Sequence, residues 1–102
     1  MEDQEKARNF IMENSLQSGA SVWVHDLQSE LGEVSKELLK ASDYGDEEVD
    51  FPEEMEEEVG DIYFSLLGLA DELGIDLSSS LETVLEKYRE RAEESGDPGS
   101  GY

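Results

Sequence analysis

The sequence predicts an all-α domain built from four helices. Apolar residues recur at intervals of three and four along most of the chain, and the strict alternation that is typical of β-strands is missing. Short breaks and one long acidic segment divide these helical patterns. Because 102 residues suffice for only one small domain, we expect a single helical domain over residues 1–95 and a flexible C-terminal tail over residues 96–102.

The first two predicted helices differ in their amphipathic character. Residues 2–16 carry few apolar side chains, so we expect a polar helix that docks on another part of the protein. The second helix should begin near residues 18–21, where serine and glycine are suitable caps, and should end near Ala41. Its apolar stripe consists of Leu27, Leu31, Val34 and Leu38.

The second half of the domain has clearer end signals. Residues 42–51 are polar and acidic and form the one sizeable predicted loop, after which Pro52 suits the first turn of a third helix. That helix should stop at Gly74, and Asp76 can cap a fourth helix that ends before the glycine-rich tail. The apolar series of these two helices are Met55, Val59, Ile62, Leu66, Leu69 and Leu73, and then Leu77, Leu81, Val84, Leu85 and Tyr88.

The third helix is apolar on more than one side, because Tyr63, Phe64 and Leu67 lie away from its main stripe. Such a helix needs cover on both sides, which a small chain with a polar first helix cannot easily supply. We therefore expect a homo-oligomeric helical bundle, either a homodimer or a homotetramer.

The chain is extremely acidic, with 28 acidic and 7 basic side chains and a formal net charge of -21. Nucleic acids and anionic membranes are disfavoured as partners, because binding to phosphates depends on lysine and arginine. Self-repulsion at low salt should destabilise so small a fold, whereas molar salt screens it, which indicates a protein from a halophile. A solvated acidic face without such adaptation is the alternative.

Several kinds of site and location are excluded by what the sequence lacks. No cysteine is present, so any metal site must use oxygen ligands or the single histidine, His25. The longest apolar run, residues 62–70, is too short to cross a membrane, and no signal peptide is recognisable, so we expect a cytoplasmic protein. An EF-hand calcium site is excluded, because residues 43–48 lack the glycine that its loop needs. A ferritin-like di-iron site is excluded as well, because it needs glutamate three residues before a histidine, and Val22 stands there before His25.

Two similar acidic segments carry the candidate chemistry. Glu30 and Glu33 in the second helix, and Glu58 and Asp61 in the third, each enclose a glycine and lie 28 residues apart. The i, i+3 spacing places both acids of a pair on one face, at the flank of the apolar stripe. Four carboxylates beside a partly dry seam repel one another unless a divalent cation binds. Mg²⁺ is the natural occupant, because it prefers oxygen ligands and commonly shares them with substrate phosphates.

A non-catalytic interpretation of the same features stays open. Acidic pairs at this spacing arise by chance in so acidic a chain, and Glu90 with Glu93 is an example. A helical adaptor, whose apolar seam binds a partner helix and whose carboxylates are solvated, would need no metal. The hypothesis of a metal site therefore depends on the fact that the acidic pair with an enclosed glycine occurs twice, each time beside an equivalent apolar stripe.

The segments Glu30-Leu31-Gly32-Glu33 and, 24 residues later, Glu58-Val59-Gly60-Asp61 resemble the ExxE and ExxD motifs of the MazG-like nucleoside triphosphate pyrophosphohydrolases, which are all-α NTP pyrophosphatases. The resemblance extends over residues 22–91. It implies a four-helix unit in which these four acids hold Mg²⁺, or Mn²⁺ as a substitute, and Glu30 positions the attacking water. The implied reaction is hydrolysis of an NTP or dNTP between the α and β phosphates. Dimeric dUTPases and phosphoribosyl-ATP pyrophosphohydrolases are close alternatives in the same superfamily.

Several further residues are candidates for substrate binding. Lys87 and Arg91 lie four residues apart and could reach phosphate together, although each can equally face a glutamate three residues further on. The family often has a Lys-Asn pair in the final helix, whereas Tyr88 follows Lys87 here, so the preference for base and sugar stays undetermined. Trp23 and His25 could each stack on a base, and packing within the protein is the alternative for both.

Overall fold

The computed structural model describes residues 2–41 and 53–95, and all regular secondary structure in these ranges is helical. The helices are α1 (Glu2–Glu13), α2 (Ala20–Ala41), α3 (Glu54–Leu73) and α4 (Leu77–Ser95). The predicted all-α class and order of helices are therefore confirmed, although the first helix ends earlier than expected. The predicted loop at 42–51 and the predicted tail at 96–102 lie outside the described residues.

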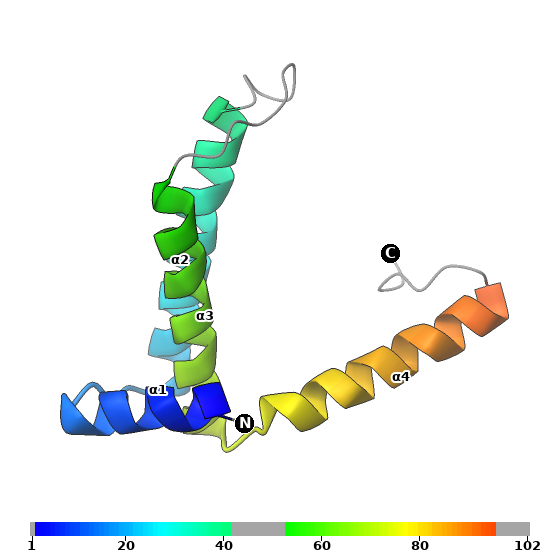
Figure 1. Cartoon of the computed structure of the whole chain (residues 1–102), viewed down its shortest axis with the longest axis horizontal. Coiled ribbons are helices and arrows are strands. Elements are labelled where there is room, and N and C mark those ends of the chain that lie inside the picture. The colour runs from blue at the N-terminus through cyan, green and yellow to red at the C-terminus, as the bar shows by residue number, and fades with distance from the viewer. Residues whose placement is uncertain (1, 42–52, 96–102) are drawn as a thin grey trace.

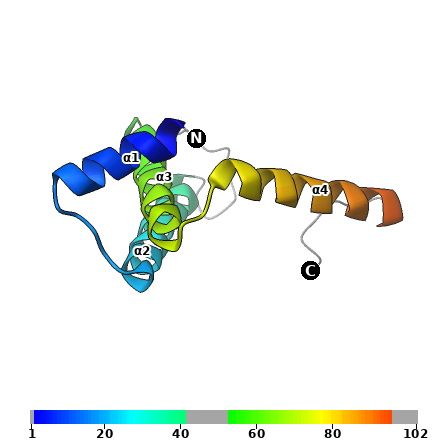
Figure 2. The same ribbon diagram turned by 90° about the horizontal axis from the view of Figure 1, so that it is seen from below.

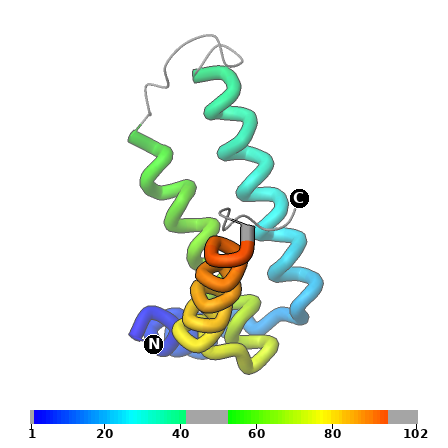
Figure 3. Tube along the Cα trace, turned by 90° about the vertical axis from the view of Figure 1, so that its right-hand side faces the viewer, coloured from blue at the N-terminus to red at the C-terminus, as the bar shows by residue number. Residues whose placement is uncertain are grey.

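The four helices form an open arrangement in which one of them stands apart. α2 and α3 pair as an antiparallel hairpin, and α1 lies across one end of it against α3 (Figure 1). α4 points away from the hairpin, and the main helix–helix contacts of the described residues are those of α3 with α2 and with α1 (Figures 1 and 2). Figure 3, seen from the side toward which α4 projects, shows α2 and α3 side by side behind it. The radius of gyration is 16.7 Å, whereas a compact chain of this length would have about 13 Å.

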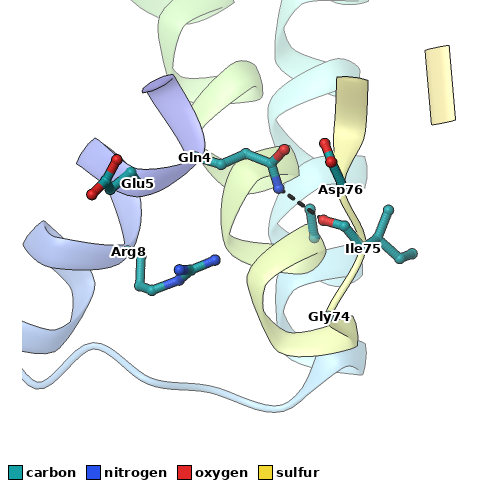
Figure 4. Close-up of a pocket in the computed structure, with 7 residues that line it drawn as sticks. Gln4, Glu5, Arg8, Gly74, Ile75 and Asp76 are labelled. Atoms are coloured by element: carbon teal, nitrogen blue, oxygen red, sulfur yellow. Dashed lines mark hydrogen bonds between the residues drawn. The ribbon is translucent and has the colours of Figure 1, made fainter. Parts of the chain in front are cut away.

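Polar contacts attach α1 to the link between α3 and α4. The buried side chain of Gln4 donates from Nε2 to the Ile75 carbonyl (2.8 Å) and accepts at Oε1 from the Leu77 N–H (2.7 Å). Arg8 Nε pairs with Asp71 Oδ1 at 2.6 Å. Figure 4 shows Gln4 reaching across to this link from α1. The expectation that the polar first helix docks on another part of the protein is confirmed.

The predicted stop of α3 at Gly74 and the predicted cap of α4 at Asp76 are also confirmed, whereas Pro52, predicted in the first turn of the third helix, lies outside the described residues. Gly74 adopts left-handed dihedral angles (φ 67°, ψ 30°), which glycine tolerates without strain, and its N–H donates to the Asp71 carbonyl at 3.2 Å. The Asp76 side chain accepts a hydrogen bond from the Ser78 N–H at 3.0 Å. This bond satisfies one of the amides that have no partner at the start of a helix.

The apolar core is small and lies where α1, α2 and α3 meet. Trp23 of α2 packs against Gly68, and its ring meets that of Phe64 edge-on with centroids 5.8 Å apart. Phe64 makes a similar contact with Phe10 of α1 at 6.0 Å. These aromatic rings join three helices. The buried apolar residues are Ala7, Ile11, Trp23, Met55, Leu67 and Ala70.

The second apolar side of α3 is partly covered by α1. Phe64 contacts Phe10 of α1, the Tyr63 hydroxyl donates to Asp3 Oδ2 at 2.7 Å, and Leu67 is buried. The polar first helix therefore supplies part of the cover that was expected only from another copy of the chain, while Tyr63 stays 39% exposed and Phe10 51% exposed. The case for an assembly depends also on exposed apolar residues elsewhere.

The predicted apolar stripes are only partly buried. Leu31, Val59 and Leu73 are 49%, 52% and 53% exposed, so this part of the prediction is wrong for the single chain. The seam between α2 and α3 keeps Leu27, Val34, Met55, Ile62 and Leu69 of the predicted stripes and adds positions that the stripes did not include. Its residues again recur at intervals of three and four, as in helices that pack nearly parallel or antiparallel. The seam positions, all buried or partly buried, are Leu27, Glu30, Val34, Glu37 and Ala41 on α2, and Met55, Glu58, Ile62, Ser65 and Leu69 on α3.

Gly68 is required by the packing of Trp23. A Cβ atom at this position would lie 2.6 Å from the indole atoms Cε3 and Cζ3. We expect Gly68→Ala to lower the free energy of unfolding by about 1 kcal/mol, because overpacking costs about 1–3 kcal/mol and outweighs the gain of ~1 kcal/mol in helix propensity.

Gly32→Ala is the matched control, since nothing lies within 4 Å of a Cβ there. That control should stabilise α2 by about 0.5–1 kcal/mol. Urea denaturation followed by circular dichroism measures both, and a Gly68→Ala protein as stable as Gly32→Ala would contradict the packing argument.

Candidate functional site

The two predicted acidic pairs lie on the facing helices of the hairpin. Glu30 and Glu33 belong to α2, and Glu58 and Asp61 belong to α3. Partial burial raises the pKa of Glu30, and the negative charges of Glu33, Asp61 and Asp26 raise it further. The fold therefore brings together carboxylates that are 28 residues apart in the sequence.

A fifth carboxylate, that of Glu37, belongs to the same cluster and was missed by the sequence analysis. A hydrogen bond with the Glu37 side chain, together with partial burial and the charges of Glu37, Glu33 and Glu30, raises the pKa of Glu58 to about 7. Two carboxyl groups can form such a bond only when one of them carries a proton, because a carboxylate has no donor. The Oε2 atoms of Glu37 and Glu58 are both buried. Unless a shared proton joins the two side chains, neither atom has a hydrogen-bond partner in the described part of the chain.

The spacing of Glu37 contains the signal that could have identified it. Glu37 lies seven residues, about two helical turns, after Glu30. The spacing of the acids predicts that they lie on the flank of stripes that include Leu31 and Val59. The structure instead exposes both apolar residues and places Glu30, Glu37 and Glu58 in the seam itself.

The cluster has the donor chemistry that a hard divalent cation requires. Mg²⁺ and Mn²⁺ prefer carboxylate oxygens, and Oε2 of Glu37 and Oε2 of Glu58 are buried oxygens without a donor. Arg8 and Arg89 form their ion pairs with acids outside this cluster. Among the residues that the structure describes, no three acidic or histidine side chains converge closely enough to hold one ion as they stand. The carboxylates fit a metal by chemistry and charge, and their side chains would have to turn toward a common point to bind it.

The predicted substrate-binding residues do not lie beside these acids within one chain. Lys87 and Arg91 are on α4, which projects away from the hairpin, and Lys87 Nζ is 5.3 Å from the ring centroid of Tyr88 (Figure 1). Trp23 is only 6% exposed and packs against Gly68, so it is a core residue rather than an open surface for stacking. Packing, the alternative considered for Trp23, is what the structure shows.

Comparison with protein families places the chain in a known class. The family model of the MazG nucleotide pyrophosphohydrolase domain matches residues 19–95, which include α2, α3 and α4 and all five acids of the cluster. The chain therefore belongs to the MazG nucleotide pyrophosphohydrolase family. No curated protein and no solved structure matches it. None of the described helices is both long enough and apolar enough to cross a membrane.

Proposed function

We propose that the protein hydrolyses a nucleoside triphosphate, either an NTP or a dNTP, between the α and β phosphates to the monophosphate and pyrophosphate, with Mg²⁺ as its cofactor. The observation that carries this proposal is the pairing of the two acidic segments across α2 and α3, inside the part of the chain that matches a pyrophosphohydrolase family. An acidic cluster of this kind repels an anionic substrate unless a cation lies between the two.

The proposed metal ligands are Glu30, Glu33, Glu58 and Asp61, and Mn²⁺ should be able to replace Mg²⁺. A bound divalent cation supplies neutralisation of the phosphate charge and orientation of water for in-line attack. Glu30 is the residue that we expect to hold the attacking water. In the metal-free protein, partial burial and the charges of its acidic neighbours raise the pKa of Glu30.

Product analysis tests the proposed reaction. The protein is incubated with Mg²⁺ and a panel of NTPs and dNTPs that includes dUTP, and pyrophosphate is separated from orthophosphate. We expect pyrophosphate and a nucleoside monophosphate. Orthophosphate released with a nucleoside diphosphate would contradict cleavage at the α phosphorus. The panel also determines the preference for base and sugar, which would reveal a dUTPase, and phosphoribosyl-ATP tests the other close alternative.

We also propose that the working form is a homodimer or homotetramer. α4 projects away from the hairpin, and its apolar residue Leu81 is 57% exposed (Figure 1). α3 likewise exposes Val59 and Leu73. In an assembly, Lys87 and Arg91 of one copy could approach the acids of another, which is how these two residues could still bind phosphate. A cytoplasmic location and a halophilic source stay predictions.

Light scattering tests this assembly. We expect at least the mass of a dimer for the wild type, and a shift toward monomer for Leu81→Glu, because the new charge would have to be buried in the apolar contact. Thr83→Glu is the matched control, since it adds the same charge to an exposed position on the opposite side of α4. A wild type that has only the monomer mass at high salt would overturn the proposal.

A further inference from the structure

We propose that Glu37 is a fifth carboxylate of the metal site and binds the cation together with Glu58. The inference rests on the proposed function, because it concerns the same metal. The paired acidic motifs account for four acids, and Glu37 lies outside them, four residues after Glu33 on α2.

Position in the hairpin is the first observation that supports this role. Glu37 is a partly buried seam residue of α2, and its side chain interacts across the seam with that of Glu58 on α3. A glutamate at such a position would ordinarily be replaced by an apolar side chain or be paired with a base. Lys36 and Lys40, the two basic residues near it on α2, are both exposed and form no ion pair with it in the described structure.

The buried oxygens are the second observation. Oε2 of Glu37 and Oε2 of Glu58 are both shielded from solvent, and neither has a donor among the described residues. A buried acceptor without a partner is unfavourable, and for an ionised carboxylate the penalty is larger. A proton shared by the two side chains joins them while one carboxyl is protonated, and a divalent cation satisfies both oxygens once that proton is lost, since hard cations commonly bind through carboxylates from different elements. Exposed acids such as Glu57, on the same turn as Glu58, have no such deficit.

A purely structural role for Glu37 makes a different prediction. If the side chain only fills the seam, its replacement by the isosteric glutamine should change folding stability without changing affinity for metal. If it is a ligand group, metal affinity must fall even where the fold is intact. Direct measurement of metal binding therefore separates the two roles, and it does not depend on turnover.

The experiment is isothermal titration calorimetry of the full chain with Mn²⁺, after circular dichroism has confirmed that each variant is helical. We expect Glu37→Gln to weaken Mn²⁺ binding by about 10–100-fold, the range seen when groups that support a metal site are removed. Glu57→Gln is the matched control, because it removes the same charge from an exposed neighbour of Glu58, and it should stay within about 2-fold of wild type. Glu37→Asp, which keeps the charge and shortens the side chain, should also bind more weakly than Glu57→Gln.

The outcomes separate this inference from the proposed function. If the wild type binds Mn²⁺ and both Glu37 variants bind it as tightly as Glu57→Gln, the role of Glu37 is refuted and the proposed function stands. If the wild type itself binds no Mn²⁺, the proposed function and the inference fall together. Weaker binding by both Glu37 variants with a normal control supports the inference.

Discussion

Asp61→Asn should reduce turnover by at least about 100-fold while leaving the metal-free fold as stable as the wild type or more so. The substitution keeps nearly the same volume and removes one negative charge from a cluster in which Asp61 repels Glu30. Asparagine still offers a carbonyl oxygen, but a neutral one, so the affinity for Mg²⁺ should fall even if the geometry survives. Calorimetric titration with Mg²⁺ or Mn²⁺, an assay of pyrophosphate release and a thermal melt in chelator measure the three quantities.

Glu93→Gln is the control for this experiment. Glu93 and Glu90 have the same i, i+3 spacing as the proposed ligands, but they are exposed on α4 and lie outside the seam. The control should leave metal affinity and turnover near wild type and change stability by no more than about 0.5 kcal/mol. If the protein is instead a non-catalytic adaptor, both substitutions should have only the small effects on stability that are typical of surface residues, and neither should change metal binding. Equal metal titrations for Asp61→Asn and Glu93→Gln would therefore refute the enzyme and favour the adaptor.

The metal-free protein should be more stable near pH 5 than near pH 8, the reverse of what salt-bridged carboxylates produce. The pKa of Glu58 is raised in the folded state from 4.5 to about 7. Between these two values the folded state keeps a proton that the unfolded state has lost, so the free energy of unfolding falls as pH rises through this window. Below the window the group is protonated in both states and contributes no further change. Glu58→Gln should remove most of this pH dependence, whereas Glu57→Gln should keep it.

Thermal melts followed by circular dichroism measure this effect in buffer that contains a chelator. At the higher pH, adding Mg²⁺ or molar salt should raise the midpoint, because ligation and screening relieve the same repulsion. Recovery by salt would also support the expectation, drawn from a net charge of -21, that the fold is adapted to high ionic strength. A midpoint that rises from pH 5 to pH 8 in chelator, or one that ignores salt and Mg²⁺, would contradict the account of the cluster.

Local signals in the sequence determined the helices and the acids that they carry. Gly74 ends α3 and Asp76 caps α4 through contacts within a few residues of themselves, so their effects can be predicted without knowledge of the fold. The same holds for the i, i+3 spacing of each acidic pair, which is a property of any helix. The equivalence of the two segments then indicated that they would meet once the helices paired, and the structure does bring them together.

Tertiary structure alone decided which side of each helix is buried. Apolar residues lie on several sides of α2 and α3, so periodicity favoured a stripe through Leu31 and Val59, whereas contacts between distant residues selected a seam that includes Glu37 and Glu58. Trp23 entered the core because a glycine far away in the sequence leaves room for its indole. Hydrophobic burial is not directional, and a helix with apolar residues on several sides can bury any of them. Which side it buries depends on the partner that packs against it, and α4, which projects away from the hairpin, leaves Leu81 57% exposed.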